Sequence, residues 1–541
     1  MMRWFGWGDE GSSTIELPAG AGPLLRELRA GDRHTPPVAL SDVRLPEPAL
    51  SDAVLSRLVD AVGEDNVLLD RLTRVSRAAG RSYPDLVRLR SGDGSGAPDA
   101  VVRPGGDAEV ARVLETCAEA ELAVIPFGGG TSVVGGVEAL RGGFGAAITL
   151  DLARMDALVE LDRLSELATF QPGISGPRAE ALLQSRGFTL GHFPQSYEFA
   201  TIGGYVATRS AGQASTGYGR IDELVHGVRL IAPAGQLEMK PLPASAAGPS
   251  LRELIVGSEG ALGVITEATL SVRPLPARRR YEGWSFRSFA EGCEAFRHLE
   301  QSGGGPDVAR LSDEHETRLS MAMASSGSTA ERAGKAYLRL RGHEGGCLVI
   351  VGFEGEEKDV DARRSHTRSL LRSGGGLALG ERPGNAWLRS RYSGPYLRDA
   401  LLDRGVFVET LETAATWSRL AGVYEAVGSA LRDSLAAPLV MCHVSHLYRS
   451  GASRYFTFIA AQEQGSELDQ WRRAKAAATG AIAAHGGTIT HHHAVGRDHA
   501  PWLRAEIGDL GIGVLRSAKE RLDPRGIMNP GKLLPEADLQ R

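Results

Sequence analysis

The chain has 541 residues, and its 61 basic and 66 acidic side chains give a formal net charge of −5 at pH 7. This balance argues against electrostatic binding of nucleic acid. Hydrophobic residues make up 42% and charged residues 23%, values typical of globular proteins. The four cysteines form no paired motif, and no apolar run reaches the roughly 18 residues of a membrane span. We therefore expect a multidomain enzyme without disulfides.

The first 96 residues are interpreted as a lead-in segment. Helical spacing of apolar residues predicts a helix at about 51–63, with Ser51 as its N-cap. The start, MMRWFGWGDEGSS, has no apolar stretch followed by a cleavage site, so we do not expect secretion.

A strand–helix–strand unit begins near residue 99. PDAVVRP is predicted as a strand, and the next segment as a helix with Asp107 as its N-cap. LAVIPFGGGTS is predicted as a strand that continues into a glycine-rich loop. Further strands are expected at 146–152, at 167–173 and up to residue 273, with a helix around 176–186.

The loop PFGGGTSVVGG at 126–136 is a candidate anion site. Three consecutive glycines let backbone N–H groups approach a phosphate without interference from a Cβ, and Thr131 and Ser132 add hydroxyl donors. A loose turn is the alternative. The loop does not match the dinucleotide GxGxxG motif, because no amphipathic helix starts directly after it. A pyrophosphate held by a loop is the better fit.

Four segments carry a family resemblance: PDAVVRPGGDAEV, IPFGGGTSVVGG, TIGGYVATRSAGQASTGYGRIDELV and GSEGALGVITEATLSVRP. In order and spacing they resemble the FAD-binding fold of the vanillyl-alcohol oxidase / p-cresol methylhydroxylase (PCMH) superfamily. PYLRDALLDRGVFVETLETAATW, GASRYFTF and THHHAVG are similar to the alkyldihydroxyacetonephosphate synthases within it.

The resemblance implies an α+β fold, with a two-subdomain PCMH-type FAD-binding domain and a mixed α/β cap domain for the substrate. The expected boundaries are 1–96 for the lead-in, 97–275 for the FAD domain, 276–494 for the cap, and 495–541 for a C-terminal segment that returns to the FAD domain.

The same resemblance places the cofactor site. No His or Cys stands in the first glycine loop, where covalently flavinylated members carry one, so noncovalent FAD is expected. The segment PQSYEFATIGG departs from the family pattern, because Ser196 and Tyr197 replace Asp and Pro. The implied cofactor-binding residues are Pro126, Phe127, Gly128, Gly129, Gly130, Thr131, Ser132, Ser196, Thr201, Ile202, Gly203, Gly204, Arg209, Ser210, Gly212, Ser258, Glu259, Gly260, Leu262, Gly263, Val264 and Ile265.

Tyr455 and a histidine triplet form the candidate catalytic group. Taken alone, a strand tyrosine such as Tyr455 is usually a packing residue, but it aligns with the family's proton-transferring residue. A phenol needs cationic or hydrogen-bonding neighbours to act as a base, and His491, His492 and His493 are candidates. If GGTIT and the triplet are extended, His491 and His493 share one face and His492 points away.

A metal site is the alternative interpretation of these histidines, because His443 and His446 add an HxxH pair. Related 2-hydroxyacid dehydrogenases bind a divalent metal through His and a Glu-His pair, but here His492 occupies the position of that Glu. No carboxylate ligand is evident, so no metal is expected.

Two arginines complete the implied site. Arg398 aligns with the family's substrate-phosphate residue, and a planar guanidinium suits bidentate phosphate binding. Arg310 aligns with a second functional arginine, expected near the flavin.

The resemblance implies exchange of the acyl group of acyl-dihydroxyacetone phosphate for a fatty alcohol through a flavin N5 adduct, as in ether lipid synthesis. The alternatives are an FAD-dependent dehydrogenase or oxidase of a 2-hydroxy acid or other alcohol, and a flavin-binding protein without catalysis. We expect a small-molecule lipid substrate, a bacterial cytoplasmic homodimer, and peripheral membrane contact on the basis of the resemblance alone.

Overall fold

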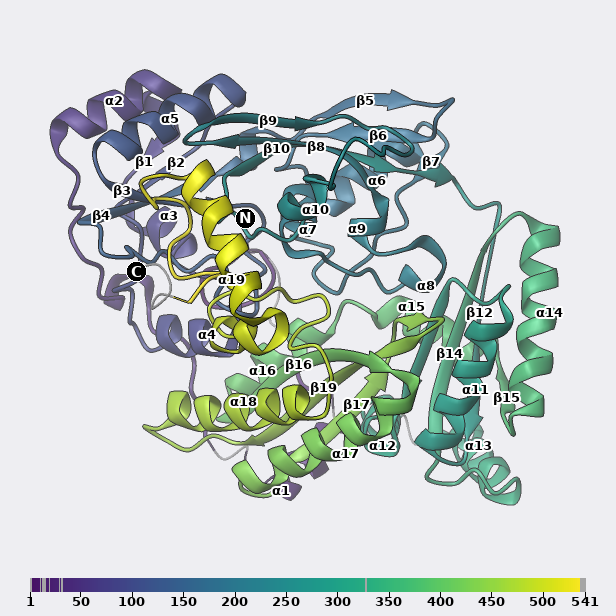
Figure 1. Cartoon of the computed structure of the whole chain (residues 1–541). Coiled ribbons are helices and arrows are strands. Elements are labelled where there is room, and N and C mark those ends of the chain that lie inside the picture. Colours follow the sequence, from purple (N-terminus) through teal and green to yellow (C-terminus); the bar gives the residue numbers. More distant parts are fainter. Residues whose placement is uncertain are drawn as a thin grey trace.

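The computed structural model describes residues 2–9, 11, 16–18, 20–28, 30, 33–325 and 328–535. It contains separate sheets of four, five and eight strands, together with one short strand pair. In Figure 1 the two smaller sheets lie in the upper half and the large sheet in the lower half, and the C-terminal helix α19 (Leu503–Leu522) runs between them. The segregated sheets confirm the expected α+β class. Among the described residues, no helix is long and apolar enough to cross a bilayer.

The four-stranded sheet has the order β1-β2-β4-β3, with β2, β4 and β3 parallel and β1 antiparallel. Its parallel strands are continuous apolar runs, as expected of strands covered on both faces. Ser51 caps α2 as predicted. Asp107 is not the N-cap of α5: Gly106 precedes the helix, and the Asp107 carboxylate pairs instead with Arg229 at 3.3 Å. The bounds are α2 (Asp52–Val62), β1 (Val67–Leu68), β2 (Ala100–Val102), α5 (Asp107–Glu119), β3 (Leu122–Phe127) and β4 (Ala146–Asp151).

The five-stranded sheet is antiparallel, with the order β5-β6-β10-β8-β9. Buried and half-buried residues alternate along β6, whereas β8 and β10 in the middle of the sheet are buried at most positions, and the helices of this unit pack on the same apolar core. The elements are β5 (Leu158–Asp162), β6 (Leu167–Phe170), α6 (Gly176–Gln184), α7 (Ile202–Thr208), α9 (Ile221–Leu224), β8 (Val225–Ala232), β9 (Gly235–Met239), α10 (Arg252–Ile255) and β10 (Val264–Ser271).

The eight-stranded sheet forms the cap, with the order β15-β12-β14-β13-β17-β19-β16 and β18 paired to β19. Every pairing in it is antiparallel. Its strands are β12 (Arg278–Phe286), β13 (Val308–Ser312), β14 (Cys347–Gly355), β15 (Leu377–Gly380), β16 (Val406–Thr416), β17 (Leu439–Val444), β18 (Leu447–Tyr448) and β19 (Gly451–Ala461). Its helices are α11 (Phe289–Ser302), α12 (Glu314–Met323), α13 (Thr329–Leu340), α14 (Glu357–Ser373), α15 (Glu381–Ser390), α16 (Gly394–Leu402), α17 (Trp417–Ser434) and α18 (Glu467–Ala484).

The two ends of the chain tie these parts together. The lead-in supplies β1 and α2 to the first sheet, and its Trp7 ring packs on Phe199 at 5.4 Å. At the other end, Asn529 donates to the carbonyl groups of Gly136 (3.1 Å) and Glu259 (2.6 Å). The segment after α19 therefore fastens the glycine loop to the loop before β10. The remaining elements are α1 (Ala21–Glu27), α3 (Arg71–Ser76), α4 (Tyr83–Arg90), β7 (Phe188–Thr189), α8 (Ser215–Tyr218) and β11 (Arg273–Pro274).

Candidate active site

The glycine loop after β3 packs directly on a second chain segment. A Cβ on Gly129 would lie 2.0 Å from the Phe199 carbonyl oxygen, and one on Gly128 would lie 2.4 Å from Thr201 Oγ1. Gly130 has a φ of +68°, a left-handed value that favours glycine. Within the described chain, the N–H groups of residues 128–132 donate no hydrogen bond to protein. The loop therefore presents unpaired backbone donors, as a pyrophosphate requires.

The loop before β10 adds a buried hydroxyl to this cradle. Ser258 is 2% exposed, and its Oγ has no hydrogen-bond partner in the part of the chain described. Glu259 is committed elsewhere: its carboxylate accepts from the N–H groups of Val495 (2.9 Å) and Gly496 (2.7 Å). Free N–H groups, an orphaned hydroxyl and side-chain-free glycines together fit FAD.

Arg209 supports the loop that carries Ser258, and its backbone is in the left-handed conformation. Its φ is 52°, at the C-cap of α7. Its guanidinium donates to the Val256 carbonyl at 2.9 Å and pairs with Glu253 at 3.2 Å. In the structure the Arg209 side chain holds the segment before Ser258 in place. The cofactor-binding role of Arg209 and of its neighbours in sequence stays a prediction.

The unusual segment around Tyr197 forms a packed turn. The Tyr197 ring stacks on Tyr392 at 5.4 Å and meets Phe193 edge-on at 5.3 Å. The Ser196 carbonyl accepts from Ala200 N at 2.9 Å. The two substitutions are thus accommodated by aromatic packing between the FAD domain and the residues before α16.

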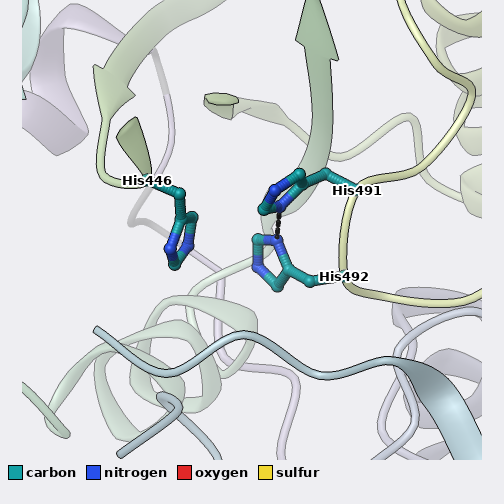
Figure 2. A group of neighbouring side chains, drawn as sticks. All are labelled: His446, His491 and His492. Carbon is teal, nitrogen blue, oxygen red and sulfur yellow. Dashed lines mark hydrogen bonds between the residues drawn. The ribbon is translucent and has the colours of Figure 1, made fainter. Parts of the chain in front are cut away.

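The histidine triplet lies in a loop, where its members converge. His491 Nδ1 and His492 Nδ1 are 2.9 Å apart, so the expected opposite orientation of His492 is wrong. Figure 2 shows His446 facing this pair from another segment. The ring centroid of His446 lies 5.0 Å from that of His491 and 5.1 Å from that of His492.

The reason for this convergence is Glu412, which the sequence analysis missed. Its side chain is buried and accepts from the backbone N–H groups of all three histidines, at 3.1 Å for His492 and 2.9 Å for His493. Thr490 Oγ1 donates to it at 2.7 Å. In an extended segment these backbone N–H groups would donate to a neighbouring strand, and here they donate to the Glu412 carboxylate instead.

The charge state of Glu412 follows from these contacts. Burial alone raises its pKa, but attraction to His492, His493 and His491 as they become protonated in acid, together with the Thr490 hydrogen bond, outweighs burial and brings the pKa well below its ordinary value. Glu412 is therefore a carboxylate at neutral pH. No short-range sequence signal indicates its role, because it precedes His491 by 79 positions.

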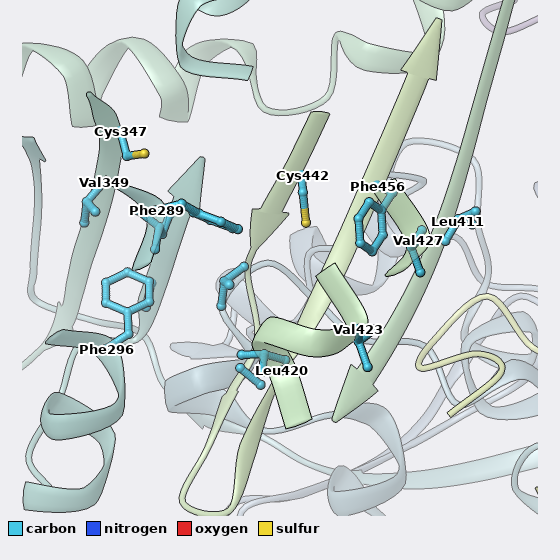
Figure 3. Close-up of a cluster of buried hydrophobic side chains, with 14 of the residues drawn as sticks. Phe289, Phe296, Cys347, Val349, Leu411, Leu420, Val423, Val427, Cys442 and Phe456 are labelled. Carbon is cyan, nitrogen blue, oxygen red and sulfur yellow. The ribbon is translucent and has the colours of Figure 1, made fainter. Parts of the chain in front are cut away.

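Strand pairing explains how Glu412 comes to lie next to Tyr455. In the β16–β19 ladder, Glu412 pairs with Tyr455 and the preceding Leu411 with Phe456. Leu411 and Phe456 belong to the apolar core of the cap, against Val423 of α17 (Figure 3). Since side chains alternate along a strand, the pair Glu412–Tyr455 takes the opposite face. The cap core thereby fixes the face that carries the candidate chemistry.

Tyr455 is surrounded by imidazoles. Its ring stacks on His443 with centroids 4.8 Å apart, and lies 6.0 Å from His492 and 5.5 Å from His493. Burial raises the pKa of Tyr455 to about 12, although a hydrogen bond with Thr410 lowers it. The isolated chain therefore holds Tyr455 as a neutral phenol.

The surrounding imidazoles are neutral as well. Burial lowers the pKa of His491 well below its ordinary value, lowers that of His492, and lowers that of His493 to about 3. Of the two kinds of neighbour expected for the phenol, cationic or hydrogen-bonding, the triplet in the isolated chain is suited to the second, and its predicted catalytic role stays a prediction. Neutral imidazoles are instead able to accept a proton.

One ring nitrogen from each of His446, His491 and His492 lies within 4.8 Å of the other two, close enough to be considered as metal ligands. The outward nitrogens have hydroxyl partners: His446 Nδ1 lies 2.6 Å from Ser215 Oγ, and His491 Nε2 lies 2.6 Å from Tyr448 OH. Glu412 supplies the nearby carboxylate that the sequence argument did not find. The absence of a metal stays a prediction.

A cavity of about 590 Å³ lies behind these histidines. Ser215 and Tyr448 line it, with Glu223, His226 and Arg273 among the other polar groups. Its lining also includes the apolar residues Leu190, Leu224 and Leu447, so the cavity is of mixed polarity.

The two predicted arginines occupy different parts of the cap. Arg310 on β13 donates to Glu316 at 2.9 Å, and its Nη2 lies 3.0 Å from His443 Nδ1. Because the His443 ring stacks on Tyr455, Arg310 is linked to Tyr455 through His443. Arg398 on α16 donates to the Arg81 carbonyl at 2.7 Å, and its buried Nε has no partner in the described chain. Its Nη2 also contacts Asp399 at 3.3 Å, so this half-buried guanidinium keeps one donor, Nε, for an anion.

The fold and the cradle define an FAD-dependent flavoprotein of the linked-oxidase type. The family described as FAD binding domain matches residues 98–239, and FAD linked oxidases, C-terminal domain, matches residues 275–533. The alkyldihydroxyacetonephosphate synthase of Trypanosoma brucei brucei is 33% identical, with 99% of this chain and 92% of that protein covered. The Dictyostelium discoideum synthase is 32% identical, with 99% and 93% covered.

A solved structure agrees with this. An alkyldihydroxyacetonephosphate synthase has a TM-score of 0.85 at 30% identity, covering 98% of this chain and 99% of its own. The chain belongs to the alkyldihydroxyacetonephosphate synthase family.

Proposed function

We propose that this protein exchanges the acyl group of acyl-dihydroxyacetone phosphate for a fatty alcohol. The observation that carries the proposal is the gathering of Tyr455 and the histidine triplet around the Glu412 carboxylate, in a family whose relatives bear the name of this synthase. In the overall exchange the bond between the ester oxygen and the methylene carbon beside the ketone breaks, and the acyl group leaves as a carboxylate. The alcohol oxygen then bonds to the same carbon, and one proton is released.

Different side chains bind the substrate and transfer its proton. Arg398 holds the phosphate through its Nε, since its two Nη groups already donate to the Arg81 carbonyl and to Asp399. Tyr455 moves the proton at the carbon beside the ketone. Since burial raises the Tyr455 pKa to about 12, its phenol must give up its own proton before it can accept one. The neutral imidazoles of His443 and His492 pack against its ring and are the candidate bases for that proton.

FAD, when bound noncovalently, supplies the electron-accepting centre for the deprotonated carbon. Residues 126–132 and Ser258 hold its pyrophosphate side through backbone N–H groups and hydroxyls. The exchange requires no oxidant, because the oxidation states of the products together equal those of the substrates. The homodimer, the bacterial source and the cytoplasmic location stay predictions.

Product balance tests this proposal. Holoenzyme is incubated without oxygen or any electron acceptor with palmitoyl-dihydroxyacetone phosphate and hexadecanol, and both products are quantified by mass spectrometry. We expect one hexadecyl ether per palmitate released, over many turnovers. Palmitate without ether, or turnover only of a 2-hydroxy acid with an added acceptor, would reject the exchange.

A further inference from the structure

Helix α13 (Thr329–Leu340) has no fully buried residue among those whose side chains are described. Only Glu331 and Leu338 are half-buried. These two residues are seven apart, which is two helical turns, so they share the face that rests on the protein. The rest of the helix surface is open.

The open face carries an apolar stripe. Ala333, Tyr337 and Leu340 follow at i, i+4 and i+7, a spacing that puts them in one row. Tyr337 is 45% exposed and Leu340 is 84% exposed. A helix on a soluble surface normally turns such a stripe inward, whereas α13 turns it outward. In Figure 1, α13 lies at the lower right edge of the cap.

Basic side chains flank the stripe. Residues 329–341 contain four basic groups, Arg332, Lys335, Arg339 and Arg341, against one acid, Glu331. The local charge is +3 in a chain whose net charge is −5. Lys335 pairs with Glu331 at 2.7 Å, which leaves the three arginines as the excess.

We propose that α13 docks on the surface of an anionic lipid bilayer. The tyrosine and leucine enter the boundary between headgroups and acyl chains, and the arginines extend their aliphatic stems along the apolar layer while their guanidinium groups reach lipid phosphates. The clustered positive charge complements an anionic membrane, whereas two copies of this helix placed face to face would bring like charges together. The inference goes beyond the proposed function and does not depend on the reaction.

Vesicle co-sedimentation of the full-length holoenzyme tests the docking surface. Phosphatidylcholine vesicles with and without phosphatidylglycerol serve as probes. We expect binding to the anionic vesicles that weakens at high salt, because salt screens the attraction between the arginines and the lipid phosphates. Leu340→Gln should lower the partition coefficient on the order of tenfold. The double variant Arg332→Gln/Arg339→Gln should remove the preference for phosphatidylglycerol.

A matched control comes from α19, where Leu510 is also 84% exposed. Leu510→Gln removes the same apolar surface from another helix and should leave vesicle binding unchanged. Equal binding by wild type and Leu340→Gln, or a loss with Leu510→Gln alone, would overturn the proposal. A change of molar mass in light scattering for Leu340→Gln, with vesicle binding intact, would assign the stripe to self-association and overturn it as well.

Discussion

The cradle of the FAD domain and the tyrosine–histidine site of the cap are built in opposite ways. Most of the cradle comes from one short loop whose glycines and hydroxyls are adjacent in the chain, and Ser258 is added from the loop before β10. The cap site needs four distant segments: β16 for Glu412, β19 for Tyr455, the β17 end for His443, and the loop at 490–493. Local backbone shape defines the first site, and strand register and one buried carboxylate define the second. Substitutions should therefore affect cofactor and chemistry separately.

Loss of the cradle should have the largest effect. Gly129→Ala places a Cβ where the Phe199 carbonyl oxygen lies 2.0 Å away, so the loop must shift. We expect purified Gly129→Ala to contain almost no flavin and to be inactive, as measured by its absorbance near 450 nm. Gly106→Ala is the control, because nothing lies within 4 Å of its Cβ position. Full flavin content in Gly129→Ala would show that the loop is no cradle.

Removal of one hydroxyl from the cap site should separate chemistry from cofactor binding. Tyr455→Phe should lower kcat by roughly 1,000-fold, with FAD retained, because the proton-transferring group is gone. Tyr424→Phe deletes a buried hydroxyl that bonds Asp313 at 3.2 Å, elsewhere in the cap. That control should keep its kcat. Unchanged turnover in Tyr455→Phe would remove this residue from the mechanism.

Glu412→Gln tests whether the buried carboxylate organises the triplet. An amide has one acceptor oxygen, so the backbone N–H groups of the histidines lose partners. We expect kcat to fall on the order of 100-fold and the free energy of unfolding by about 3 kcal/mol. Glu409→Gln changes a buried acid on the same strand that binds Trp471 at 2.6 Å. A similar kcat loss in both variants would mean general damage to β16 rather than a role in placing the triplet.

Arg398→Ala should act on substrate binding. We expect KM for the phosphate substrate to rise roughly 10-fold or more, with a smaller change in kcat, because a charge-assisted contact is lost. Arg404→Ala, an exposed arginine just beyond α16, should leave KM unchanged. An unaltered KM in Arg398→Ala would place the phosphate elsewhere.

The low pKa of Glu412 gives the smallest predicted effect, a pH dependence of stability. In the unfolded chain the Glu412 carboxyl has a pKa of about 4.3. Its folded pKa is lower, so its contribution is complete above that pH and is lost as the pH falls through the folded pKa. The difference in unfolding free energy between wild type and Glu412→Gln should thus shrink below about pH 4. A constant difference in denaturant titrations would contradict the depressed pKa.

The same contrast explains what could be predicted from the sequence. The helices α2 and α6 and the strand β4 follow local apolar patterns and were expected close to their observed bounds. His492 was placed on the wrong side, because strand alternation assumes a neighbouring strand and here Glu412 takes the N–H groups. The charge states of Tyr455 and the histidines depend on burial, which no local pattern reveals. Residue types at the cap site were predictable from resemblance, and their geometry was not.

An anaerobic absorbance titration of the purified flavoprotein tests the central claim most directly, namely that the cap site acts on an acylated ketone phosphate. Palmitoyl-dihydroxyacetone phosphate is added to one cuvette and a panel of 2-hydroxy acids to another. We predict that the first bleaches the flavin absorbance with release of palmitate, and that hexadecanol restores it. Bleaching by a hydroxy acid alone, with recovery only on admission of oxygen or an electron acceptor, would contradict the account.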